Sequence, residues 1–167
     1  MPRIEAIEPW AFKDMARLEK LVLGKNSIST IEPYTFAGLN KLRDLRLAKN
    51  KIQVVKSSAF RGLHNLVTLR LEKNDINRIE SESFAGLHNL QILRLDWNQI
   101  NRIEHMAFVE LDSLRSLDLS WNQINIIENG TFAGLDTLRD VTLRGNPVTC
   151  ADAHAAGLPQ SVECEGF

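Results

Sequence analysis

The chain repeats itself every 24 residues, and this period constrains its fold more than any other feature. One polar position recurs as Asn26, Asn50, Asn74, Asn98, Asn122 and Asn146. An aromatic position recurs as Phe12, Phe36, Phe60, Phe84, Phe108 and Phe132. A single unit cannot bury its own apolar face, so consecutive units must stack into a solenoid.

Each unit reads LxxLxLxxNxIxxIxxxxFxxLxx. Its LxL segment alternates as a strand does, with leucines facing inward and the residues between them facing outward. Stacked units therefore form a parallel sheet, and the rest of each unit returns along the opposite side. We predict one domain, with a partial N-terminal repeat over 1–17, five full repeats over 18–137, and a last strand with a C-terminal cap over 138–167.

The repeated asparagine, here called the Asn ladder, is an amide within an apolar pattern. Its side chain has two donors and one acceptor, so it can pair with backbone groups of its own repeat and of the adjacent one. We interpret the Asn ladder as structural. The repeated phenylalanine, the Phe ladder, is interpreted as part of the core.

This pattern resembles the leucine-rich repeat, in the 24-residue subclass common in extracellular receptors. The resemblance implies an α/β solenoid shaped as a horseshoe, with a concave parallel sheet, an irregular or short-helical convex side and a disulfide C-terminal cap. The stretch "NPVTC" resembles the opening of extracellular C-terminal caps of this family. Val148 stands where tryptophan is usual and Asp152 where a second cysteine is usual, which implies one disulfide rather than two.

Cys150 and Cys164 flank the segment "ADAHAAG", which suits a short helix. A pair of reduced thiols is the alternative, but we favour a disulfide because the two cysteines bracket a cap at one end of the chain. At the other end, Ile4, Ile7 and Trp10 lie in register with later repeats and leave an apolar edge partly bare. Truncation, self-capping, a preceding module, a covering partner or self-association through this edge would each explain it.

The location of the protein is inferred from several features. The chain lacks a signal peptide and any apolar run long enough to span a bilayer, so it is cytosolic or its signal has been removed. Asn129 begins a glycosylation sequon on the return segment. Together with the cysteine pair and the repeat subclass, this sequon favours a secreted or cell-surface protein. The net charge of −1 offers no global field that attracts nucleic acid.

Candidate binding residues lie at the outward strand positions, which the resemblance places on the concave face. Cations collect in the first repeats and carboxylates in the later ones, where two tryptophans stand on neighbouring strands. The predicted ligand-binding residues are Arg70, Glu72, Arg94, Asp96, Trp97, Asp118, Trp121 and Asp140. Indole faces and carboxylates suit sugars or cationic groups. The alternative is that these side chains are only solvated charges and covers for the strand exits.

The function predicted from these residues is recognition rather than catalysis. The sequence shows no nucleophile motif and no phosphate-binding loop. It also shows no metal-ligand constellation, because His64 and His88 lack a third ligand. We therefore expect no cofactor. The resemblance is greatest to variable lymphocyte receptors, which implies an immune-type module that binds microbial-surface or carbohydrate antigen. An adhesion or signalling ectodomain that binds a host protein is the alternative, and it would also use Arg46, Arg70 and the basic first repeats.

Overall fold

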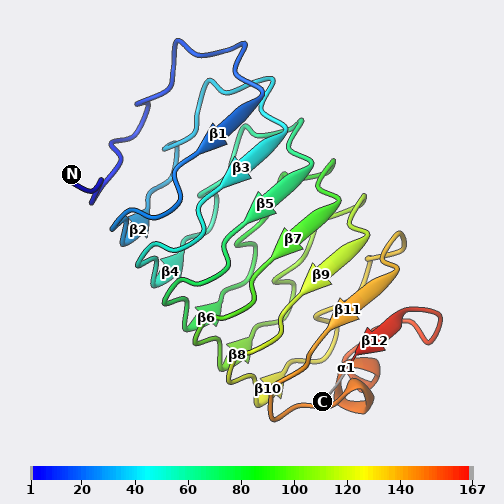
Figure 1. The fold of residues 1–167 in the computed structure, drawn as a ribbon. Helices are drawn as coiled ribbons and strands as arrows, with labels where there is room; N and C mark the ends of the chain where they lie inside the picture. The colour runs from blue at the N-terminus through cyan, green and yellow to red at the C-terminus, as the bar shows by residue number, and fades with distance from the viewer. Residues whose placement is uncertain (1, 166–167) are drawn as a thin grey trace.

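The computed structural model describes residues 2–165, which form a solenoid of about six turns (Figure 1). The larger sheet is wholly parallel, and its neighbouring strands pair without a shift in repeat position, as Leu45 opposite Leu69 shows. In spatial order it contains β1 (Lys20–Val22), β3 (Asp44–Arg46), β5 (Thr68–Arg70), β7 (Ile92–Arg94), β9 (Ser116–Asp118), β11 (Asp140–Thr142) and β12 (Glu163–Glu165). The predicted parallel-sheet solenoid is confirmed.

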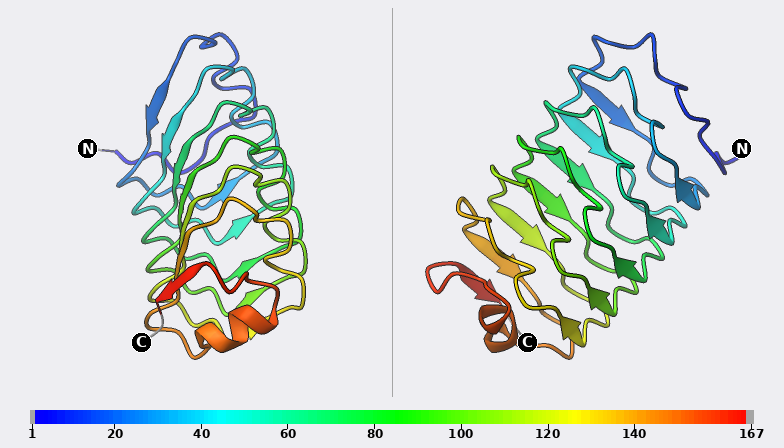
Figure 2. Two further views of the ribbon diagram at one scale, coloured as in Figure 1. Left: turned by 90° about the vertical axis from the view of Figure 1, so that its right-hand side faces the viewer. Right: turned by 180° about the vertical axis from the view of Figure 1, so that it is seen from behind.

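The return side differs from the expected irregular or short-helical side, because it forms a second parallel sheet of two-residue strands between turns (Figure 2). These strands are β2 (Thr30–Ile31), β4 (Val54–Val55), β6 (Arg78–Ile79), β8 (Arg102–Ile103) and β10 (Ile126–Ile127). The second Ile of the repeat pattern, exemplified by buried Ile79 and Ile103, faces inward at the same height in successive turns. That common register aligns the backbones closely enough to pair.

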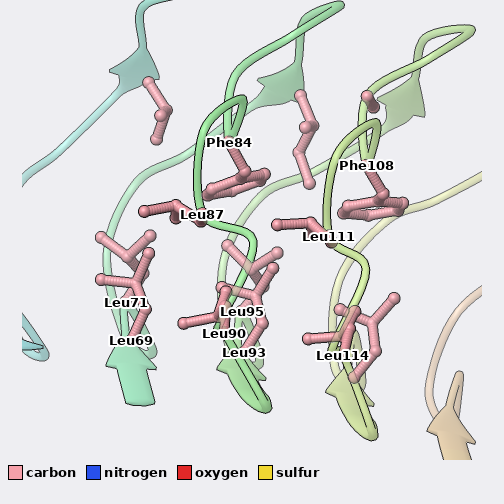
Figure 3. Packing of buried hydrophobic residues seen from close by; sticks show 14 of the residues in the cluster. Leu69, Leu71, Phe84, Leu87, Leu90, Leu93, Leu95, Phe108, Leu111 and Leu114 are labelled. Atoms are coloured by element: carbon pink, nitrogen blue, oxygen red, sulfur yellow. The ribbon is translucent and has the colours of Figure 1, made fainter. Parts of the chain in front are cut away.

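The core lies between the two sheets. The strand leucines and the Phe ladder point toward one another there, as Figure 3 shows for Leu93, Leu95 and Phe84. Neighbouring rings of the Phe ladder are stacked, with centroids 6.0 Å apart for Phe60 and Phe84 and 6.2 Å apart for Phe84 and Phe108. Full burial of one such side chain contributes about 1.5–3 kcal/mol, so neighbouring repeats stabilise each other.

The Asn ladder satisfies backbone groups where the chain leaves each strand. The Asn98 amide nitrogen donates to the carbonyl oxygens of Leu95 (3.0 Å) and, in the preceding repeat, Leu71 (3.1 Å). Its oxygen accepts from the backbone N–H of Ile76 at 3.1 Å. Each of these carbonyl oxygens also accepts from a second asparagine of the ladder. The N–H of Ile76 would be left unpaired in the interior without Asn98, which costs about 1–3 kcal/mol.

The C-terminal end is closed by α1 (Cys150–Ala155) and β12. Thr149 starts the helix with a capping box, since its side chain accepts from the backbone N–H of Asp152 while the Asp152 carboxylate accepts from the backbone N–H of Thr149. Cys150 and Cys164 form the expected disulfide. Figure 2 shows the helix lying across the last turn of the solenoid, and it is the one helix within residues 2–165.

Candidate functional site

The outer surface of the larger sheet, here called the sheet face, carries the side chains that alternate with the buried leucines. On β7, Leu93 is buried whereas Ile92 is 39% exposed. Because strands pair in register, residues 24 positions apart become neighbours, about 4.8 Å from one another along the sheet. The predicted site residues therefore come from adjacent strands and their exits, and they share one surface.

Two carboxylates on the sheet face were missed by the sequence prediction. Glu163 and Glu165 belong to β12, where they pair in register with Asp140 and Thr142 of β11. The cap sequence breaks the repeat pattern, so no spacing indicated that a further strand would join the sheet. The acidic end of the sheet face consequently extends one strand beyond the predicted site.

Trp97 and Trp121 stack on each other at the strand exits, with ring centroids 5.1 Å apart and an angle of 19° between the planes. They remain 52% and 44% exposed. The Lys73 ammonium lies 5.9 Å from the Trp97 ring centroid, and the Arg144 guanidinium lies 5.9 Å from that of Trp121. The stack is thus flanked by two cations.

The residue following Arg144 has to be glycine. Gly145 has a positive φ of 74°, and a Cβ built on it would lie 2.7 Å from a ring atom of Trp121. The backbone here approaches the indole too closely for any side chain. The position of Trp121 is therefore fixed from both sides, by Trp97 and by the backbone at Gly145.

Arg94 joins two of the predicted ligand-binding carboxylates. Its Nε donates to Asp96 at 3.1 Å, and its Nη2 lies 3.0 Å from a carboxylate oxygen of Asp118. Burial opposes the charge of Arg94, but its hydrogen bond to Asp96 and the negative charges of Asp96 and Asp118 raise its pKa. Asp96 is only 6% exposed, so it acts mainly as a partner of Arg94 rather than as a free acceptor for a ligand.

Other carboxylates of the acidic end also have partners within the chain. Asp118 accepts from the backbone N–H of Ser120 at 3.0 Å and from its hydroxyl at 2.6 Å. Asp140 accepts from the Ser116 hydroxyl at 2.8 Å. Both carboxylates keep other lone pairs, so a ligand can bind them only beside these existing hydrogen bonds.

The basic end of the sheet face contains a hollow of about 340 Å³. Gly24 and Ala48 are among its lining residues, and they leave space because they stand where later repeats have Glu72 and Asp96. Its other lining residues are Val22, Lys25, Arg46, Lys49, Arg70 and Glu72. Charge is thus segregated along the sheet face, and the net charge of −1 conceals a local excess of cations. That net charge was therefore the wrong basis for excluding anionic partners such as nucleic acid.

The remaining predicted positions lie elsewhere. Asn129 is exposed on a turn after β10, where its carbonyl oxygen contacts the ring of His105 at 2.9 Å. His88 lies 2.7 Å from a carboxylate oxygen of Asp112, on the turns that precede the strands. Within residues 2–165, no cluster of three or more ligating side chains could hold a metal, and no helix has the length and apolar character needed to cross a membrane.

The pattern of the family described as "Leucine rich repeat" matches residues 2–52, 41–100 and 89–148. The chain belongs to the leucine-rich repeat family. A search among curated proteins finds no match. Neither the 24-residue subclass nor the variable-lymphocyte-receptor subtype is established by this match.

Solved leucine-rich-repeat structures share the fold. A structure entitled TLR13-ssRNA13 complex matches at 30% identity with a TM-score of 0.88, covering 96% of this chain and 23% of that chain. FLRT2, in an octameric complex with latrophilin 3 and Unc5D, matches at 28% identity with a TM-score of 0.76, covering 90% and 48%. An internalin from Listeria monocytogenes matches at 23% identity with a TM-score of 0.66, covering 87% and 40%, and shows the fold alone. The chain thus spans less than half of each of these longer chains.

Proposed function

We propose that this leucine-rich-repeat chain is a non-enzymatic, extracellular recognition module that binds a protein partner across its sheet face. The observation that carries the proposal is the exposed stack of Trp97 and Trp121 beside charges of both signs. Large, rigid aromatic side chains with surrounding polar groups are typical anchors of protein interfaces. The disulfide supports an oxidising location such as the cell surface or the secreted medium.

The distribution of charge favours a polypeptide over a long polyanion. A nucleic acid or a sulfated glycan lying along the sheet face would meet cations at β1–β5 but carboxylates at β9–β12. Like charges placed together in an interface suppress binding. A protein can present acidic groups to one end and basic groups to the other. The assembly of FLRT2 with protein partners is consistent with this mode of binding in the family.

Microbial or carbohydrate antigen, as in an immune-type receptor, stays a prediction. That prediction depended on an accessible indole face and on carboxylates that are free to bind a sugar. Both inner indole faces are covered by the stack, cations flank the outer ones, and Asp96 is held by Arg94. These contacts make the region less suited to a sugar than the sequence indicated, and we therefore rank a protein partner first.

A binding screen tests the proposal. The chain would be measured against a panel of host ectodomains, a glycan array, whole bacteria and single-stranded RNA. Tyr34→Ala is the matched control for Trp97→Ala, because Tyr34 is a 45% exposed aromatic residue in a different stack, on Trp10. We expect saturable binding to an ectodomain that Trp97→Ala weakens about thirtyfold, whereas Tyr34→Ala binds like the wild type.

Two outcomes would overturn the proposal. One is binding to glycans, bacteria or RNA without any protein ligand. The other is a protein ligand whose affinity is unchanged by Trp97→Ala.

A further inference from the structure

Three arginines occupy equivalent positions on β3, β5 and β7, but the middle one is paired differently from the others. Arg46 lies in register with Arg70, and Arg70 with Arg94. Arg46 donates through Nε to both oxygens of Asp44, at 3.0 and 3.2 Å, and Arg94 donates to Asp96 at 3.1 Å. Two of the three guanidinium groups are therefore hydrogen-bonded to carboxylates of their own strand or strand exit.

Arg70 makes no such hydrogen bond. Its closest carboxylate oxygen belongs to Glu72 and lies 3.9 Å from Nη1, beyond hydrogen-bond distance. Arg70 Nε and Glu72 Oε2 are both buried and have no partner among residues 2–165. The Arg70 side chain is still 40% exposed, so the outer part of its guanidinium is accessible from the hollow.

The single carboxylate beside Arg70 is shared among several cations. The charge of Glu72 also contributes to the raised pKa of Arg46, after the larger effect of the Asp44 hydrogen bond, and to that of Arg94. Lys25 and Lys49 line the same hollow, and neither makes an ion pair within the described residues. The hollow is therefore lined by four cations, one carboxylate and small residues, and one of its arginines has unfilled hydrogen-bonding capacity.

We infer that this hollow is an anion subsite that takes a carboxylate side chain from a short acidic segment of the protein partner. A carboxylate can accept two parallel hydrogen bonds from a guanidinium, which Glu72 does not do here. Exposed Val22, at 60%, offers an apolar contact for the stem of such a side chain. The partner's chemistry rests on the proposed function, whereas the anion preference rests on the hollow alone. The acidic segment can extend only along β1, β3 and β5, because the carboxylates from Asp96 onward would repel it.

The subsite would place the partner in one direction along the solenoid. The hollow lies at one end of the sheet face, and the carboxylates of β11 and β12 lie at the other. An acidic segment bound at the hollow leaves the rest of the partner over the tryptophan stack. Binding in the reversed direction would bring carboxylates against carboxylates, which is unfavourable.

A peptide titration followed by NMR of the arginine side chains tests the inference without any knowledge of the partner. The probes are an end-blocked tetraglutamate peptide, the matching tetralysine peptide and inorganic phosphate. We expect tetraglutamate to saturate and to shift the Arg70 guanidinium signals, with no effect from tetralysine. Arg70→Gln should weaken tetraglutamate binding about fivefold, and Glu72→Gln, which removes the competing carboxylate, should strengthen it about twofold.

Arg115→Gln is the control for charge, because Arg115 is exposed and lies outside the hollow. It should bind tetraglutamate as the wild type does. An equal loss in Arg115→Gln and Arg70→Gln would overturn the inference, as would weaker binding in Glu72→Gln. Phosphate that shifts the same signals at equal or lower concentration would show an inorganic-anion site instead. Trp97→Ala should leave peptide binding unchanged, so failure of the proposed function would be distinguishable from failure of the subsite.

Discussion

The two ends of the solenoid are built from the same kind of repeat, but they expose very different amounts of apolar surface. At the C-terminal end, the apolar residues Leu138 and Val141 are 7% and 0% exposed, because α1 and β12 cover them. In the first turn, Ile4 is 42% and Met15 49% exposed. This difference shows that the apolar side of each repeat must be covered by the segment that follows it in the stack. A segment outside the repeat pattern, such as the C-terminal cap, can cover it as well as another repeat does.

The largest effect is expected when the same repeat position, that of the Phe ladder, is changed at both ends. Phe132 is 0% exposed and stacks on Phe108, whereas Phe12 stacks on Phe36 but is only partly buried. Phe132→Ala should lower the free energy of unfolding by about 3–5 kcal/mol, because it leaves a closed cavity. Phe12→Ala should cost about 1–2 kcal/mol, since less apolar surface is lost from the interior. Urea unfolding measures both, and equal losses would refute the role given to the cap.

Removal of the disulfide is the next largest test. Cys150 and Cys164 are separated by 14 positions, and a loop of this size is worth about 3 kcal/mol of stability. Replacing both cysteines with serine should therefore loosen the C-terminal end. Hydrogen exchange should show lost protection in β11 and β12, while β1 and β3 keep theirs because repeats contact only their neighbours. Reduced wild type is the control, and a uniform loss along the sheet would contradict the prediction.

The smallest expected effect is the pH dependence of the cap. The backbone hydrogen bond from Thr149, followed by that from its hydroxyl, lowers the pKa of Asp152 below the usual range of an aspartate. The capping contribution is therefore fully present above the ordinary aspartate pKa of about 4, and it is lost as the pH falls through the lowered value. NMR of α1 between neutral and acid pH should show fraying that Asp152→Asn makes independent of pH. Unchanged fraying behaviour in that variant would exclude this carboxylate as the cause.

The repeated parts of the fold were predictable from the sequence because every copy meets the same surroundings. The leucines, the Phe ladder and the Asn ladder each recur with one spacing, so one physical argument applies to all copies. The second sheet was not predicted, because two residues are too few to show the apolar–polar alternation that indicates a strand. The strand β12 was missed because it lies outside the repeat, and its pairing with β11 depends on the path that the chain takes through the cap.

The candidate site was only partly predictable. Alternation along the strands placed Arg94, Asp96 and Asp118 on one surface, but it could not show that the arginine holds both carboxylates, because that depends on side-chain rotamers. Nor could it show that Trp97 and Trp121 adopt positive φ angles of 56° and 54°, a backbone conformation with little signal in residues other than glycine. The hollow beside Arg70 depends on such rotamers and on the small residues at Gly24 and Ala48 together.

The unshifted pairing of successive strands has a consequence for how such a protein can be altered. Inserting one complete 24-residue unit between β5 and β7 would leave every strand with an equivalent neighbour. The distance separating the Arg70 hollow from the tryptophan pair would then change by about 4.8 Å, with the chemistry of each untouched. The spacing between the two binding regions can thus be changed by one strand at a time, without altering the residues that contact a ligand at either region.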